Sequence, residues 1–168
     1  VNMGVGTATK IGLEAAKKIG ADIVLTMDAD GQHDAKDILA LVNPIIKKEA
    51  EIVLGARDFS YKYMPAIKVV GNWLMNLLTL LVFHKWVSDS QSGMKAFSRK
   101  AIELIQIDSI GYEICSEIIG EAKHNKLEIL EVPIKTIYTD YSKSRGQNIF
   151  NAVNIFTKIL ALKFNKRR

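Results

Sequence analysis

The segment that most constrains the fold is a short apolar run, residues 22–27 (DIVLTM), which leads directly into two aspartates, Asp28 and Asp30. Its aliphatic and β-branched residues, without polar alternation, are typical of a strand that is buried on both faces. Such strands belong to α/β sheets, and ligands bind to open α/β sheets at the carboxyl ends of the strands. The sequence therefore predicts an α/β domain with a polar site immediately after residue 27.

Helical and strand-like patterns alternate along the remaining chain. Strands are predicted at 51–55, 94–97 and 127–137, and helices at 7–19, after the capping residue Asp34, at 66–83, from 98, at 112–125 and at 149–162. This order indicates a three-layer α/β/α arrangement around a mostly parallel central sheet. At 168 residues and 48% hydrophobic content, we expect one domain at 1–148, followed by an amphipathic helix and basic tail at 149–168.

The net charge of +5 belongs to the C-terminal end of the chain. Residues 141–168 hold seven Lys and Arg side chains and no acidic one, so the first 140 residues carry 16 basic against 18 acidic side chains. Nucleic-acid-binding proteins usually spread basic residues over a face or groove, and we therefore expect no nucleic-acid partner. A terminal basic cluster behind an apolar helix favours contact with anionic lipid headgroups.

The turn after the first predicted strand, residues 28–33 (DADGQH), carries the most specific chemistry. Two carboxylates one residue apart repel each other, and a divalent cation removes that repulsion because Mg²⁺ and Mn²⁺ prefer oxygen ligands. Such a cation also bridges to phosphates and neutralises a diphosphate leaving group.

Other interpretations of the acidic turn are weaker but remain open. A solvated turn that caps the next helix needs no metal. A calcium loop fits poorly, because a glycine occupies its fourth position and Leu39 its twelfth. A phosphatase with an aspartyl nucleophile also carries Asp-x-Asp after a strand, but usually continues with Gly-Thr rather than Gly31-Gln32.

At this turn the chain resembles a known family, because DADGQH is a form of the metal-binding motif common in family 2 of the glycosyltransferases. The resemblance is strongest to members similar to dolichyl-phosphate mannose synthase. Further segments that resemble the family follow in its order, namely residues 2–8 (NMGVGTA), 55–57 (GAR), 88–93 (SDSQSG) with Lys95, 111–113 (GYE), 131–134 (EVPI) and the basic loop 142–145.

The resemblance implies a nucleotide-diphospho-sugar transferase (GT-A) fold and assigns roles to several residues. Asp30 would be the main metal ligand and a catalytic residue, Asp28 would contact the metal or the donor nucleotide, and Gln32 would assist. Gly4 and Gly6 would contact the donor, and Arg57 a donor or acceptor phosphate. A solvated arginine after a strand remains the alternative for Arg57.

The segment 88–93 supplies the acceptor side of the predicted site. By its chemistry Asp89 is a candidate base for an acceptor hydroxyl, or a group that orients the sugar, although Asp and Ser are also common in turns. A lipid phosphate is already ionised and needs cations rather than a base, and Lys68, Lys143 and Arg145 are the candidates. Each could equally be solvated. Lys68, where the family often has arginine, and the loop 140–145 (DYSKSR) both depart from the family pattern.

Membrane contact is expected at a surface rather than across a bilayer. The longest uncharged run, residues 69–83, has 15 residues, which is too short to span. It is rich in leucine, and Trp73 and Trp86 lie near its ends, a pattern that fits a helix at a membrane interface as well as ordinary packing. The single cysteine, Cys115, is predicted to lie in the core and suits a reducing compartment. We therefore expect a cytoplasmic protein peripheral to the membrane.

The family places its first strands and part of its nucleotide pocket before the segment at residues 2–8, so the chain is expected to lack them. The predicted function is a metal-dependent inverting glycosyltransferase that uses a UDP- or GDP-sugar, Mg²⁺ or Mn²⁺, and a polyprenyl (dolichyl) phosphate acceptor. The alternatives are a transferase acting on a polysaccharide or another glycolipid, and a non-catalytic membrane-surface module that retains the fold.

Overall fold

A computed structural model describes residues 3–57, 66–137 and 157–159 of the chain. In chain order its elements are α1 (Val5–Lys18), β1 (Ile23–Thr26), the 3₁₀ turn η1 (Ala35–Asp37), α2 (Ile38–Ile46), β2 (Ile52–Arg57), α3 (Ala66–Phe83), β3 (Lys95–Ser98), α4 (Arg99–Leu104), α5 (Ile114–His124) and β4 (Ile129–Ile134). The predicted alternation of strands and helices is therefore confirmed over these residues.

Local signals in the sequence account for several element boundaries. Gly20 follows α1 with a φ of 71°, a left-handed conformation that glycine adopts without strain. The Asp34 carboxylate accepts a hydrogen bond from the Lys36 amide at 3.0 Å and caps η1, as predicted. Ser98 caps α4 in the same way by accepting from the Ala101 amide at 3.2 Å.

The central sheet has the strand order β1-β3-β2-β4. β3 pairs antiparallel with both β1 and β2, whereas β2 and β4 pair in parallel. Three of the four strands consequently share one direction, and the predicted α/β class is confirmed. The sequence did not predict that the reversed strand, β3, would lie between β1 and β2. This insertion places the amino end of β3 beside the carboxyl ends of β1 and β2.

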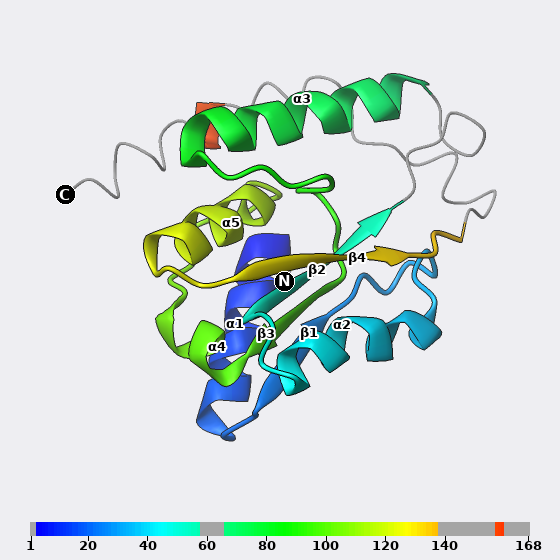
Figure 1. Cartoon of the computed structure of the whole chain (residues 1–168). Helices are drawn as coiled ribbons and strands as arrows, with labels where there is room; N and C mark the ends of the chain where they lie inside the picture. Colours follow the sequence, from blue (N-terminus) through cyan, green and yellow to red (C-terminus); the bar gives the residue numbers. More distant parts are fainter. Residues whose placement is uncertain (1–2, 58–65, 138–156, 160–168) are drawn as a thin grey trace.

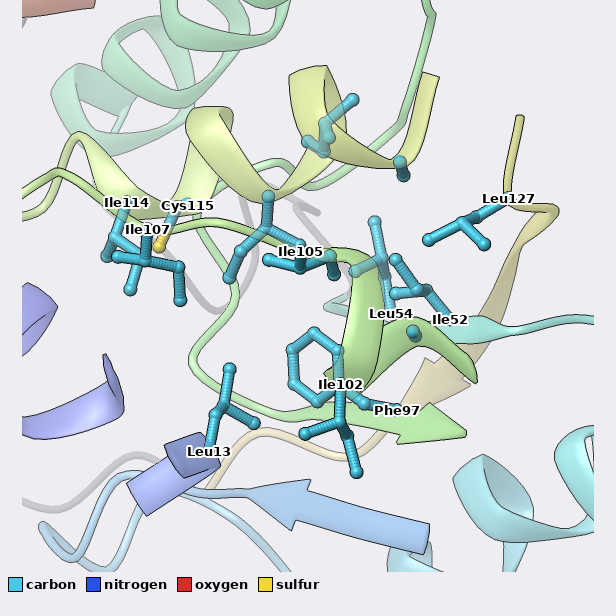
Figure 2. Packing of buried hydrophobic residues seen from close by; sticks show 14 of the residues in the cluster. Leu13, Ile52, Leu54, Phe97, Ile102, Ile105, Ile107, Ile114, Cys115 and Leu127 are labelled. Atoms are coloured by element: carbon cyan, nitrogen blue, oxygen red, sulfur yellow. The ribbon is translucent and has the colours of Figure 1, made fainter. Parts of the chain in front are cut away.

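Helices cover both faces of the sheet (Figure 1). On one face the larger core joins α1, α4 and α5 to the sheet through residues such as Leu13, Phe97 and Ile118, several of which Figure 2 shows converging. On the other face α2 contributes Leu41 and Ile45 to a smaller cluster. Cys115 belongs to the larger core, as predicted.

α3 lies outside this arrangement, on the side of α5 that is turned away from the sheet (Figure 1). Its buried apolar residues form a third cluster with Ile159, from the described C-terminal turn at 157–159. Apart from that turn, the predicted helix and tail at 149–168 lie outside the described residues. None of the described helices has the length and apolar character needed to cross a membrane.

Candidate functional site

The predicted acidic turn lies at the carboxyl end of β1, with both of its aspartates exposed. The Asp30 carboxylate accepts a hydrogen bond from the Gln32 amide at 3.0 Å, and Gly31 adopts a φ of 77° between them. This is a local turn that Asp and Gly favour. The Ile137 amide donates to the Gln32 carbonyl at 2.9 Å, which fastens the turn to the segment after β4.

Asp28 has a specific environment even though its side chain is 54% exposed. Its Oδ2 atom lies 3.9 Å from Nε2 of His33, a side chain that is only 5% exposed. His33 lowers the pKa of Asp28, as a hydrogen-bond donor and as a nearby charge, while partial burial opposes this effect. Because 3.9 Å is longer than a direct hydrogen bond, the charge of the imidazole is the effect that this separation supports.

The Asp28 carboxylate also packs against Gly93, which lies just before β3. A Cβ atom built on Gly93 would come within 2.1 Å of Asp28 Oδ2, so no other residue fits there without a shift. Thr26 reinforces this contact by donating from Oγ1 to the Gly93 carbonyl at 3.2 Å. The two segments that the sequence singled out, 28–33 and 88–93, therefore meet at one edge of the sheet.

Arg57 and Asp89 form the second half of the candidate site. Nε and Nη2 of Arg57 donate to the two carboxylate oxygens of Asp89 at 2.6 and 2.9 Å, and the Arg57 amide also donates to Asp89 at 3.2 Å. The Asp89 side chain is fully buried, whereas that of Arg57 is 20% exposed. This planar, bidentate geometry fixes the orientation of the guanidinium.

Two side chains that the sequence reasoning missed hold Asp89 in place. Glu131 of β4 accepts hydrogen bonds from the Ser88 amide at 2.8 Å and from the Asp89 amide at 3.2 Å. Asn76 of α3 donates to the Ser88 carbonyl and accepts from the Ser90 amide. Glu131 is a polar residue within an apolar strand, whereas Asn76 is one of several polar residues of α3, and no local pattern identifies either as a partner of the Asp89 segment.

The charges of Lys95 and Arg57 reach Asp28 and help to lower the pKa of its carboxyl group, which links the two halves of the site electrostatically. Asp28, Asp30, Arg57 and Asp89 thus belong to one edge of the sheet. The assigned catalytic, donor-binding and phosphate-binding roles stay predictions. In this arrangement the Asp89 carboxylate is occupied in orienting Arg57.

Gly4 and Gly6 lie at the start of α1, against the loop that precedes α5. The Gly6 amide donates to the Ile110 carbonyl at 2.8 Å, and a Cβ on Gly6 would lie 2.3 Å from the Ser109 carbonyl oxygen. Close backbone packing accounts for glycine at this position, and the predicted contact with a donor stays a prediction. Lys143 and Arg145 lie outside the described residues, and so does the side chain of Lys68.

The acidic turn offers few protein ligands for a cation. Among the described residues, no group of three or more His, Cys, Asp or Glu side chains is arranged to hold a metal ion. The two exposed carboxylates of Asp28 and Asp30 nevertheless suit Mg²⁺ or Mn²⁺, since such ions commonly bind one or two carboxylates and complete their coordination with waters and substrate phosphates. The residues present therefore fit a metal that is shared with a phosphate ligand.

Comparison with known proteins identifies the family. The model of Glycosyl transferase family 2 matches residues 1–105. The chain is also 47% identical to a UDP-N-acetylglucosamine–dolichyl-phosphate N-acetylglucosaminyltransferase of Methanococcus voltae, over 98% of the chain and 68% of that protein. The chain belongs to glycosyl transferase family 2. A more distant relative, dolichol-phosphate mannosyltransferase of Pyrococcus furiosus, is 28% identical over 83% of the chain and 39% of its own length.

Solved structures of this enzyme class confirm the GT-A fold. Glucosyl-3-phosphoglycerate synthase of Mycobacterium tuberculosis, in complex with phosphoglyceric acid, matches with a TM-score of 0.71 at 18% identity. The match covers 99% of the chain and 56% of that structure, so the chain spans little more than half of it. The same enzyme in complex with Mn²⁺ and UDP-glucose matches with a TM-score of 0.67.

Proposed function

We propose that the protein is a metal-dependent, inverting glycosyltransferase. It would transfer a sugar from a nucleotide-sugar donor, UDP- or GDP-linked, to a polyprenyl phosphate such as dolichyl phosphate. Inversion is carried over from the family resemblance. The observation that carries the proposal is the meeting of the exposed Asp28–Asp30 turn with the segment that holds the Arg57–Asp89 pair. One edge of the sheet would thus bind a metal-diphosphate and an anionic acceptor together.

The relatives support this choice of donor and acceptor. The Methanococcus voltae protein is named for a UDP-linked sugar and for dolichyl phosphate, and the Pyrococcus furiosus protein is named for dolichol phosphate. The Mycobacterium tuberculosis structure was determined with Mn²⁺ and UDP-glucose. The relative and the complex favour a UDP-sugar as the first donor to test.

The chain's own residues would act mainly by positioning. An acceptor phosphate is already ionised near neutral pH, so its oxygen can attack the anomeric carbon without a base. Arg57 carries a fixed positive charge that attracts that phosphate, and Asp89 holds its orientation. The Asp89 carboxylate is fully buried and accepts hydrogen bonds from Arg57 through both oxygens, and this geometry makes it an anchor for the guanidinium.

Asp28 and Asp30, with Gln32 assisting, would hold Mg²⁺ or Mn²⁺. When bound, the metal supplies stabilisation of the negative charge that develops on the departing nucleoside diphosphate. The turn that presents Asp30 is already formed by its bond to the Gln32 amide.

We also propose that the protein is peripheral to the cytoplasmic face of a membrane and contacts it through the outer face of α3. Val70, Trp73, Leu74 and Leu81 are all more than half exposed, and Leu77 and Leu80 between them are partly exposed. The inner face of the same helix is packed against the protein, where it buries Asn76 and Thr79 beside an apolar cluster. The exposed apolar face therefore suits an apolar environment outside the protein. Sedimentation with lipid vesicles tests this part of the proposal.

Calorimetric titration of the full-length protein with UDP- and GDP-sugars, with and without Mn²⁺, tests the central claim. We expect one nucleotide to bind only when Mn²⁺ is present. In Asp30→Ala this Mn²⁺-dependent donor binding should be lost, because only the Asp28 carboxylate would remain on the turn. Asp34→Ala is the matched control, since Asp34 caps the next turn and is expected to leave donor binding unchanged.

Two results would contradict the proposal. Tight donor binding that depends neither on metal nor on Asp30 would remove the role of the acidic turn. No binding of any nucleotide-sugar to the folded protein would instead favour the non-catalytic surface module.

A further inference from the structure

Lys95 is a charged residue in an unusual place, because it lies in the middle of the sheet. It is the first residue of β3 and pairs with Thr26 on one side and Leu54 on the other. Only 3% of its surface is exposed. Its Nζ atom donates to the Ser92 carbonyl and lies 3.6 Å from Sγ of Cys115. No carboxylate of the described part of the chain forms an ion pair with it.

The burial of this lysine without an ion-pair partner among the described residues lowers the stability of the fold. Removing a charge from water without a paired carboxylate is strongly unfavourable. The same sheet face continues into the large core, to which Phe97, two residues along β3, belongs. A methionine of similar length would pack there without this cost. The stability of the fold therefore does not explain a lysine at this position.

The contacts of Lys95 lead to the donor side of the candidate site. The Ser92 carbonyl that it binds belongs to the turn that ends at Gly93, and Gly93 supports the Asp28 carboxylate. Thr26 holds the same turn from β1, through the Gly93 carbonyl at 3.2 Å and the Lys95 carbonyl at 3.4 Å. Lys95 and Thr26 thus fasten, from two strands, the surface on which Asp28 lies.

We propose that Lys95 is a positioning residue that fixes the Ser92–Gly93 turn against Asp28 and so orders the site for a nucleoside diphosphate and its metal. This inference rests on the proposed function. A polar residue that holds the binding groups in place without contacting the ligand typically contributes about 10- to 100-fold to affinity. The loss of stability is then tolerated because it serves binding, as is common at functional sites.

The test compares UDP affinity, at saturating Mn²⁺, with the melting temperature in the full-length protein. In Lys95→Met we expect UDP to bind about tenfold more weakly or worse, while the melting temperature stays the same or rises. Lys95→Arg, which keeps a donor and a charge, should restore part of the affinity. Lys100→Met is the matched control, because Lys100, on α4, forms a partly exposed ion pair with Glu51, which lies just before β2. It should leave UDP affinity unchanged.

A second variant keeps the test decisive if Lys95→Met fails to fold. Thr26→Val removes the side-chain hydrogen bond to the Gly93 carbonyl, next to the Ser92 carbonyl that Lys95 binds, but preserves the β-branched shape that a strand favours. It should weaken UDP binding in the same direction. UDP affinity within twofold of wild type in either folded variant would overturn the role of Lys95. If the wild-type protein itself binds neither UDP nor GDP with Mn²⁺, the proposed function fails instead, and the two failures are therefore distinguishable.

Discussion

At the scale of single residues, the site is built from charges whose neighbours determine what they can do. Asp89 is fully buried, and both of its oxygens accept hydrogen bonds from Arg57. Asp28 is exposed and has its pKa lowered by His33. The sequence contains both as aspartates in polar turns, yet one anchors an arginine and the other is available to a ligand. Burial and partner explain the difference.

The pKa of Asp28 gives a prediction at this scale. Because its folded-state pKa lies below the ordinary value of 3.8, ionised Asp28 stabilises the fold above that pH. This contribution is lost as the pH falls through the lowered pKa. Replacing His33 by leucine should raise the pKa of Asp28, so that the loss begins at a higher pH. Carboxyl NMR titration of the metal-free protein measures this directly.

Glu51 is the internal control for this titration. Its pKa is lowered by the Glu128 amide and by Lys100, which are independent of His33, and it should titrate identically in both proteins. An unchanged Asp28 titration in His33→Leu would show that the imidazole does not act on this carboxylate.

At the scale of elements, α5 carries three buried glutamates at helical spacing: Glu113, Glu117 and Glu121. Glu117 accepts hydrogen bonds from the Asp108 and Ser109 amides at 3.1 and 3.0 Å. Glu121 binds the Gln106 amide in the same way at 2.9 Å. These carboxylates hold the loop before α5, and that loop packs against Gly6 of α1.

We therefore expect Glu117→Ala to lower the free energy of unfolding by roughly 3 kcal/mol, because it leaves one buried and one partly buried amide group without their acceptor. Urea denaturation monitored by circular dichroism measures the change. Glu103→Ala, at an exposed position of α4, is the control and should change stability by less than about 0.5 kcal/mol. A similar small effect of both substitutions would show that the loop does not depend on Glu117.

At the scale of the whole molecule, α3 links the candidate site to the proposed membrane surface. Its inner face binds the segment that carries Asp89 through Asn76, and its outer face is apolar. Beyond its C-terminal end, Lys85, Lys123 and Lys126 line an open hollow together with the single acidic residue Glu128. Apolar contact beside a cluster of lysines suits an anionic lipid surface.

Vesicle sedimentation should show stronger binding to anionic than to zwitterionic vesicles, and the binding should weaken as salt screens the lysines. Leu74→Gln and Leu81→Gln should each reduce partitioning about fivefold, corresponding to about 1 kcal/mol for a half-buried leucine. Leu39→Gln is the matched control, because Leu39 is 68% exposed on α2, which covers the opposite face of the sheet. Equal losses of vesicle binding in all three variants would contradict the membrane assignment. Light scattering that shows dimerisation through α3 would contradict it as well.

The sequence by itself determined the features that depend on neighbouring residues. The run 22–27 is apolar enough to form a buried strand, and Asp30 and Gly31 favour the turn that follows. The position of α3 at 66–83 follows from its predominantly apolar pattern. Asp34 was identified as a cap for the same reason, since a cap bonds to an amide two residues away. Side-chain chemistry and periodicity act over one or two turns of chain, and both can be read locally.

Only the tertiary structure decided how distant segments meet. β3 lies between β1 and β2 because the best pairing of strands is set by the packing of the whole sheet. That insertion brings Gly93 to Asp28 and lets Arg57 bind Asp89, which is 32 residues away in the chain. The roles of Glu131 and Asn76 and the burial of Lys95 follow from the same arrangement. No local pattern contains them, because a carboxylate or an ammonium group takes its function from the partners that folding places beside it.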